Sequence, residues 1–265
     1  MVNTVKASSV SDFSEQWSSY TTQQGYYASP DMLQDYFGPL MKLEDLKGCR
    51  VCEIGSGNGR FISIMSQYAD EVVGLEPSEA VEVSRQYNKD NQNVTHVNKS
   101  IYDADKPTGF DYVFCLGVLH HTGDPIETVK QIKSMLKPDG KAVIWVYGKE
   151  GNGLYLALYN TLSFFTKKMP HKLLVALSKL LTYPLMGYIA LARKIPMPMR
   201  NYMVNVLGKY SFYELELTIY DQLNPSVAAY WTKAEFSEIL RGGGLNPQEF
   251  YHRHEYSWTA VSSVA

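Results

Sequence analysis

A glycine-rich segment, VCEIGSGNGR, spans residues 51–60 and carries the clearest chemical signal in the chain. An apolar run ends in Glu53 and passes directly into Gly55, Gly57 and Gly59, with a helix expected to begin near Arg60. Glycines permit a tight turn with positive φ, and they let the backbone approach a ligand closely at a helix N-terminus. The segment therefore predicts a loop that binds a nucleotide-type cofactor.

The spacing of the glycines distinguishes between two classes of cofactor. A dinucleotide-binding loop has the pattern G-x-G-x-x-G, and in that frame the third glycine would fall at Arg60. The pattern present is E-x-G-x-G-x-G, which resembles the first motif of class I S-adenosylmethionine-dependent methyltransferases. The resemblance implies that the loop wraps the amino-acid part of S-adenosylmethionine and that Glu53 helps to orient that part.

Further segments resemble the same family in the same order across residues 50–148. Glu76 ends the run EVVGLE, 17 residues beyond Gly59, where the family has an acid that binds both ribose hydroxyls. At the adenine contact many members carry an acid, whereas this chain offers Ser100 or Asp103. FDYVFCLGVLHHTGDP resembles the fourth family motif, and a turn at 136–140 is also typical. The implied cofactor-binding residues are Glu53, Gly55, Ser56, Gly57, Asn58, Gly59, Glu76, Pro77, Ser100, Ile101, Tyr102, Leu116, Gly117 and Val118.

Methyl transfer from a sulfonium is an in-line displacement, so the enzyme mainly aligns the reactants and excludes water. A hydroxyl acceptor also needs a base, and histidine has a suitable pKa near neutrality. His120 and His121 follow the predicted fourth strand, and we expect one of them to face the cleft while the other packs. Asp221 and one of His252 or His254 are further candidates. The predicted catalytic residues are His121, His120, Asp221 and His254.

The elements that must position these residues alternate between strand and helix. Five strand-like runs lie between residues 50 and 148, and a capped helix and two more strand-like runs follow Thr232. This pattern predicts a doubly wound, mostly parallel, seven-stranded α/β sheet of the Rossmann-like type with a terminal antiparallel hairpin. We assign 1–47 to an N-terminal helical lead-in, 48–149 and 232–265 to the core, and 150–231 to a helical insertion after the fifth strand that covers the acceptor site.

Charge is segregated within the chain. The whole chain has a net charge of -2, but residues 151–213 contain eight basic residues and no acidic one, which leaves 17 basic against 27 acidic residues elsewhere. These basic residues either pair with acids elsewhere on the protein or meet an anion, such as a phosphorylated substrate or an anionic membrane surface. Lys179 and Pro184 interrupt the most apolar stretch, 173–192, and argue against a membrane-spanning helix.

The remaining composition limits the cellular setting. Three cysteines cannot form a disulfide framework, and the N-terminus has no secretory signal. We therefore expect a cytoplasmic protein. Peripheral membrane contact through 151–213 is left open. Cys49 and Cys52 form a C-x-x-C without a second pair, so we expect no metal. The near-neutral charge and the lack of a target-recognition module predict no nucleic-acid partner. A homo-oligomer stays open.

The sequence therefore predicts an enzyme that uses S-adenosylmethionine, releases S-adenosylhomocysteine and methylates oxygen or nitrogen of a small molecule. The acceptor is expected to be sugar-like or phosphate-bearing, because the insertion is both apolar and basic. Two alternatives remain: a membrane-associated lipid or quinone methyltransferase, and a cofactor-binding protein of this fold that does not methylate. More loosely, the flanks 220–231 and 252–258 resemble a bacterial subgroup from polysaccharide and secondary-metabolite clusters.

Overall fold

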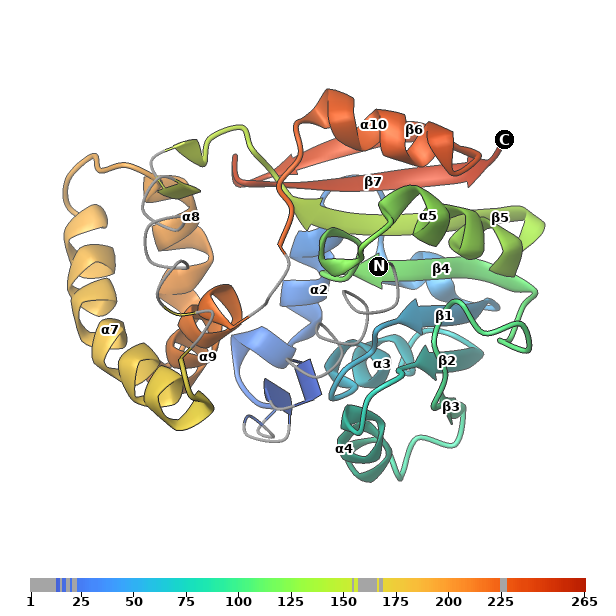
Figure 1. Ribbon diagram of the computed structural model, residues 1–265, viewed down its shortest axis with the longest axis horizontal. Coiled ribbons are helices and arrows are strands. Elements are labelled where there is room, and N and C mark those ends of the chain that lie inside the picture. Colours follow the sequence, from blue (N-terminus) through green and yellow to red (C-terminus); the bar gives the residue numbers. More distant parts are fainter. Residues whose placement is uncertain are drawn as a thin grey trace.

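The computed structural model describes residues 13–14, 16–17, 20, 23–153, 155–156, 166, 169–224 and 228–265. Its centre is a seven-stranded sheet with the strand order β3-β2-β1-β4-β5-β7-β6 (Figure 1). Strands β1 to β5 pair in parallel, whereas β7 pairs antiparallel with both β5 and β6. The predicted Rossmann-like α/β fold with a terminal antiparallel hairpin is confirmed.

The element bounds are as follows. The strands are β1 (Arg50–Ile54), β2 (Glu71–Leu75), β3 (Val94–Val97), β4 (Phe110–Leu116), β5 (Leu136–Tyr147), β6 (Leu245–Arg253) and β7 (Ser257–Val264). The helices are α2 (Pro30–Phe37), α3 (Arg60–Met65), α4 (Ala80–Tyr87), α5 (Pro125–Met135), α7 (His171–Ala192), α8 (Arg200–Asn205), α9 (Phe212–Leu223) and α10 (Lys233–Gly242). Short 3-10 turns are η1 (Tyr26–Ala28), η2 (Leu43–Leu46), η3 (Leu119–His121) and η4 (Leu207–Lys209).

The central strands are buried on both faces because helices cover both. Side chains alternate along a strand, so Phe114 of β4 packs with α2 and α3, whereas Val113 and Cys115 pack with α5 and α10. On the first face, the ring of Phe37 of α2 stacks on Phe114 with 5.5 Å between centroids. Residues 30–37 of the N-terminal segment are thus a covering layer of the sheet, while residues 1–12 of that segment lie outside the described residues.

The predicted turn at 136–140 lies within β5 rather than before it. Leu136 pairs with Phe110 and Lys141 pairs with Tyr112, so the intervening residues 137–140 form an irregularity in the β4–β5 pairing. A side chain at Gly140 would place its Cβ 2.7 Å from the carbonyl oxygen of Phe110. The strand can therefore bend at this point because glycine lets the two backbones approach closely.

A helical insertion follows β5 and lies at one end of the sheet, with α7 at the outer left edge of the molecule in Figure 1. Among the described residues, α7 alone is long and apolar enough to cross a membrane by length and composition. It packs as part of the insertion, because Leu174 is buried against Leu217 of α9 and Ile189 against Leu207 and Leu215. The insertion thus has two small apolar clusters, one of which it shares with Tyr20 of the N-terminal segment.

Candidate functional site

The glycine-rich loop joins β1 to α3 at the carboxyl edge of the sheet. Gly55, Gly57 and Gly59 have φ angles of 64°, 52° and 82°, a region that favours glycine. A Cβ on Gly55 would lie 2.5 Å from a methyl carbon of Val118, so the loop can approach the end of β4 only without a side chain there. The residue types that the motif contains are therefore required by the backbone that forms the cavity wall.

Glu76 closes β2 beside this loop. Its carboxylate accepts hydrogen bonds from the Gly57 N–H and the Ser78 N–H, each at 2.9 Å. Burial raises the pKa of Glu76, and the two backbone donors oppose that shift. Each carboxylate oxygen keeps a further acceptor position. Glu76 therefore links the two loops and can still accept hydrogen bonds from a pair of ligand hydroxyls.

Glu53 is a buried acid without a full set of partners. Its side chain is 3% exposed, and its Oε2 and the Ser56 Oγ have no hydrogen-bond partner among the described residues. Burial raises the pKa of Glu53 to about 8, with Arg60 opposing and Glu76 reinforcing the shift. A buried, unpaired acceptor is costly unless a ligand satisfies it. The position fits a cationic group such as the ammonium of an amino acid.

On the other side of Glu76 from the glycine-rich loop, a further group of lining residues follows the ends of β2 and β3. Pro77, Ser100, Ile101 and Tyr102 line one wall, and the Tyr102 hydroxyl lies 2.6 Å from the Thr128 Oγ1. Asp103, the alternative adenine contact, accepts a hydrogen bond from the Ser100 N–H at 2.9 Å instead. Asp103 is not among the residues that line the cavity.

One continuous cavity has a volume of about 540 Å³. All the predicted cofactor-binding residues except Gly59 line this cavity. Its second half extends under the insertion and is mainly apolar and aromatic. That half is lined by Leu181, Leu185, Met199, Tyr202, Met203, Leu207, Tyr210 and Ile219, together with Trp145, Tyr147, Tyr155 and Tyr230. The volume is within the range of small-molecule sites, and the two halves suit a nucleoside and a largely apolar second ligand.

The two adjacent histidines have different environments. His121 lines the cavity, and its ring meets the ring of Phe13 edge-on at 4.9 Å. His120 is fully buried outside the lining, and its ring centroid lies 4.0 Å from that of Tyr147. Burial, reinforced by His121, lowers the pKa of His120 well below its ordinary value. His120 is thus a neutral support for Tyr147, and only His121 of the pair faces the cavity.

A polar cluster joins the end of β5 to α9. The Tyr147 hydroxyl donates to Asp221 Oδ2 at 3.2 Å and accepts from the Gln222 Nε2 at 2.8 Å, while Gln16 donates to Asp221 Oδ1 at 2.8 Å. Burial, followed by the charge of Asp221, raises the pKa of Tyr147 well above its ordinary value. Tyr147 therefore remains a hydrogen-bond donor near neutral pH. The fold thus brings Asp221, a predicted catalytic residue, together with Tyr147 and Gln222 on the cavity wall, and the catalytic role of Asp221 stays a prediction.

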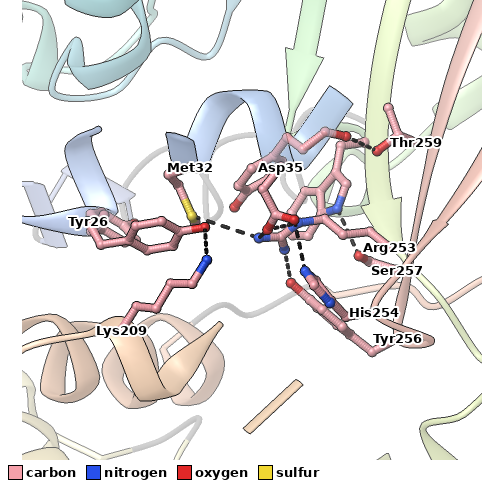
Figure 2. Close-up of polar contacts among 12 residues, drawn as sticks. Tyr26, Met32, Asp35, Lys209, Arg253, His254, Tyr256, Ser257 and Thr259 are labelled. Atoms are coloured by element: carbon pink, nitrogen blue, oxygen red, sulfur yellow. Dashed lines mark hydrogen bonds and ion pairs between the residues drawn. The ribbon is translucent and has the colours of Figure 1, made fainter. Parts of the chain in front are cut away.

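His254 lies elsewhere, in a network beside α2 (Figure 2). Asp35 accepts from Arg253 Nε at 3.0 Å and lies 2.8 Å from His254 Nε2. Arg253 is fully buried, stacks on Tyr36 at 4.3 Å and donates to the Tyr256 hydroxyl. His254 does not line the main cavity, so its placement gives no support to the predicted catalytic role. Arg253, in contrast, holds Tyr36 and Tyr256, which do line it.

Comparison with known proteins identifies the family. A family model described as a methyltransferase domain matches residues 26–196, more than half of the chain. The chain belongs to this methyltransferase family. It is an enzyme of the class I type, and S-adenosylmethionine is its cofactor, as the sequence predicts.

Curated relatives match the core of this methyltransferase. A tRNA U34 carboxymethyltransferase of Pseudoalteromonas translucida is 33% identical over 118 residues, which cover 43% of this chain and 36% of the relative. A ubiquinone biosynthesis O-methyltransferase of Haemophilus ducreyi is 30% identical over 110 residues, which cover 37% of this chain and 45% of the relative. The methyltransferase therefore matches less than half the length of either relative.

The prediction that excludes a nucleic-acid partner is wrong, because several relatives are named tRNA U34 carboxymethyltransferases. That prediction relied on the net charge of -2 for the whole chain and on the lack of a recognisable target-recognition module. The acid-free basic segment at 151–213 was assigned to a phosphorylated substrate or a membrane surface, although a local basic field of this kind also suits the phosphates of a nucleic acid.

A solved structure shares the fold across the whole chain. The Burkholderia thailandensis 1,6-didemethyltoxoflavin-N1-methyltransferase, with bound 1,6-didemethyltoxoflavin and S-adenosylhomocysteine, covers 100% of this chain and 91% of its own, with a TM-score of 0.59 and 14% identity. PKMT2 from Rickettsia typhi, in complex with AdoHcy, has a TM-score of 0.59, 15% identity, and covers 87% of this chain and 53% of its own. These likenesses establish the fold of the methyltransferase.

Proposed function

We propose that this methyltransferase transfers a methyl group to oxygen or nitrogen of a small acceptor that carries an apolar or aromatic ring. The observation that supports this proposal is the second half of the cavity, where apolar and aromatic side chains of the insertion face the polar cluster Tyr147, Asp221 and Gln222. A small ring with one or two polar substituents satisfies both parts of such a site.

We propose a division of roles within the cofactor half, which is the part of the cavity beside the glycine-rich loop. S-adenosylmethionine supplies an electrophilic methyl group on a sulfonium. We propose that Glu53 and Ser56 hold its amino-acid part, because their buried oxygens have no partner among the described residues. Glu76 accepts the ribose hydroxyls, and the wall formed by Pro77, Ser100, Ile101 and Tyr102 surrounds the adenine.

We propose that the second half of the cavity, here called the acceptor half, aligns the acceptor with the methyl group and supplies a base. His121 lines the cavity at the carboxyl edge of β4 and is the group that would take the proton of a hydroxyl acceptor. Asp221 orients the Tyr147 hydroxyl, and Tyr147 with Gln222 holds the acceptor by hydrogen bonds. We assign residues 150–231 the role of a lid, because the described side chains of this segment form much of the apolar wall.

The experiment is a search for the acceptor with the intact protein. Purified protein with labelled S-adenosylmethionine is incubated with phenols, quinols, glycosides and heteroaromatic amines, and label transfer is measured. We expect transfer to ring-bearing acceptors, and Tyr147→Phe should raise KM for the acceptor more than it lowers S-adenosylhomocysteine affinity. Tight S-adenosylhomocysteine binding without transfer to any acceptor would instead indicate a protein that binds the cofactor without methylating.

A tRNA nucleoside is the second candidate acceptor. The names of several relatives and the basic, acid-free segment 151–213 favour it. Incubation with labelled S-adenosylmethionine and bulk tRNA, followed by nucleoside digestion and mass spectrometry, tests it directly. A labelled nucleoside would replace the small-molecule proposal, whereas transfer to free small acceptors alone would support it.

A further inference from the structure

The outer face of α7 carries an unusual concentration of exposed apolar side chains. Eight large hydrophobic residues are exposed among the described residues, and six of them lie on α7 or directly after it. These six are Leu173, Leu180, Tyr183, Met186, Leu191 and Ile195. Contiguous exposed apolar surface of this kind on a protein marks an interaction site.

Helical geometry places the five of these side chains that belong to α7 within an arc of about 140° around the helix. Leu173 and Leu191 are 18 residues apart, which is five full turns, and Leu180 lies close to the same line. The opposite face of α7 carries Leu174 and Ile189, which are buried against the rest of the insertion. The exposed face runs for the length of α7, about 33 Å at the usual rise per residue.

Lysines accompany this apolar face. Lys172 and Lys179 are exposed on α7, Lys194 follows it, and none of the three forms an ion pair with any residue that the structure describes. The segment 151–213 also has no acidic residue. The sequence left open whether the basic charge is neutralised by acids elsewhere on the protein, and these three lysines are not neutralised within the described part.

We propose that the outer face of α7 binds an anionic phospholipid surface, with its axis parallel to the membrane. Exposed leucines and a methionine can enter the acyl boundary while lysines at their side meet the lipid phosphates. RNA is the less suitable partner for this face, because five of the six exposed apolar side chains are not aromatic and cannot stack on bases, and only Tyr183 could do so. Figure 1 shows α7 at the edge of the molecule, away from the sheet.

This orientation also connects the membrane to the cavity. Leu181 and Leu185 line the cavity from the same helix whose outer face carries Leu180 and Tyr183. A helix at the lipid surface would therefore form both the membrane contact and one wall of the acceptor half. Binding to the membrane does not depend on which acceptor is methylated.

The test is co-sedimentation of the full chain with phosphatidylcholine vesicles, with and without phosphatidylglycerol. We expect binding only to the anionic vesicles and release by added salt. Lys172→Gln and Lys179→Gln should each weaken partitioning about fivefold. The double variant Leu173→Ser with Leu180→Ser should weaken it at least tenfold.

Matched controls are exposed residues of the same types far from α7. Ile126→Ser on α5 and Lys89→Gln after α4 should leave partitioning unchanged, and every variant should keep its S-adenosylhomocysteine affinity. Lack of vesicle binding by a wild-type protein that binds S-adenosylhomocysteine would overturn the proposal and leave the proposed enzyme function intact. Binding of bulk tRNA that the lysine variants lose, or a concentration-dependent dimer that the leucine variants dissociate, would overturn it in favour of those partners.

Discussion

Replacing Glu53 with glutamine is expected to raise the stability of the cofactor-free protein while it lowers affinity for the cofactor. The folded protein raises the pKa of Glu53 from 4.5 to about 8, chiefly by burial. Between these two pH values the unfolded chain ionises this glutamate while the folded chain keeps it protonated. Folding then becomes less favourable as pH rises, and the stability present below about pH 4.5 is lost progressively up to about pH 8.

The magnitude follows from linkage. Each pH unit in this window costs at most about 1.4 kcal/mol, so Glu53 removes about 3 kcal/mol of stability between about pH 5 and about pH 7. Glutamine has nearly the same shape and no ionisation. The free energy of unfolding of Glu53→Gln, relative to the wild type, should therefore increase by about 3 kcal/mol over the same interval.

Urea unfolding followed by tryptophan fluorescence, without cofactor, at a series of pH values measures this difference. Glu238→Gln, at an exposed position of α10, is the matched control and should not change the pH slope. Calorimetry with S-adenosylhomocysteine should show affinity at least tenfold weaker for Glu53→Gln, because a charge-assisted contact to the ammonium is lost. A pH slope identical to that of the wild type would show that Glu53 is already ionised in the free folded protein, and the reasoning would fail.

Three further predictions concern other parts of the site. Glu76→Gln should weaken S-adenosylhomocysteine binding about tenfold or more, as measured by calorimetry. The reason is that an amide cannot accept hydrogen bonds from both ribose hydroxyls and both backbone N–H groups. Unchanged affinity would exclude the ribose role. His121→Asn should lower kcat for a hydroxyl acceptor by about 100-fold or more, with S-adenosylhomocysteine affinity retained; an unchanged kcat would assign the base elsewhere. Arg253→Met should destabilise the protein by about 3–5 kcal/mol at neutral pH in urea unfolding, because Asp35 loses its buried partner. Burial raises the pKa of Asp35, but the hydrogen bonds and charges of His254 and Arg253 outweigh burial and lower that pKa below its ordinary value. The loss of stability should therefore shrink as pH falls through the lowered pKa, and a loss that is equal at all pH values would contradict the ion pair.

The glycine-rich loop and the strand end at Glu76 could be placed from sequence because their determinants are local. The loop from Gly55 to Gly59 needs positive φ at three positions, and only the residue type glycine adopts that backbone readily. Glu76 is at the end of a strand, and parallel strands bring their carboxyl ends to one edge. The family, the fold and the cofactor therefore follow from short segments in the right order.

The acceptor half required the tertiary structure. Tyr147, Asp221 and Gln16 come from β5, α9 and the N-terminal segment, and sequence spacing cannot indicate that their side chains share hydrogen bonds. The adjacent His120 and His121 are chemically identical in sequence, and only packing against Tyr147 buries the first and leaves the second at the cavity.

His254 shows the same limit. Its residue type suggested a base, but Asp35, 219 positions away, holds its imidazole at 2.8 Å beside the buried Arg253. The sequence alone thus determined the conformation of the glycine-rich loop, because backbone conformation is a local property. The tertiary structure decided which polar side chains line the second half of the cavity, because burial and partnership depend on contacts between distant segments.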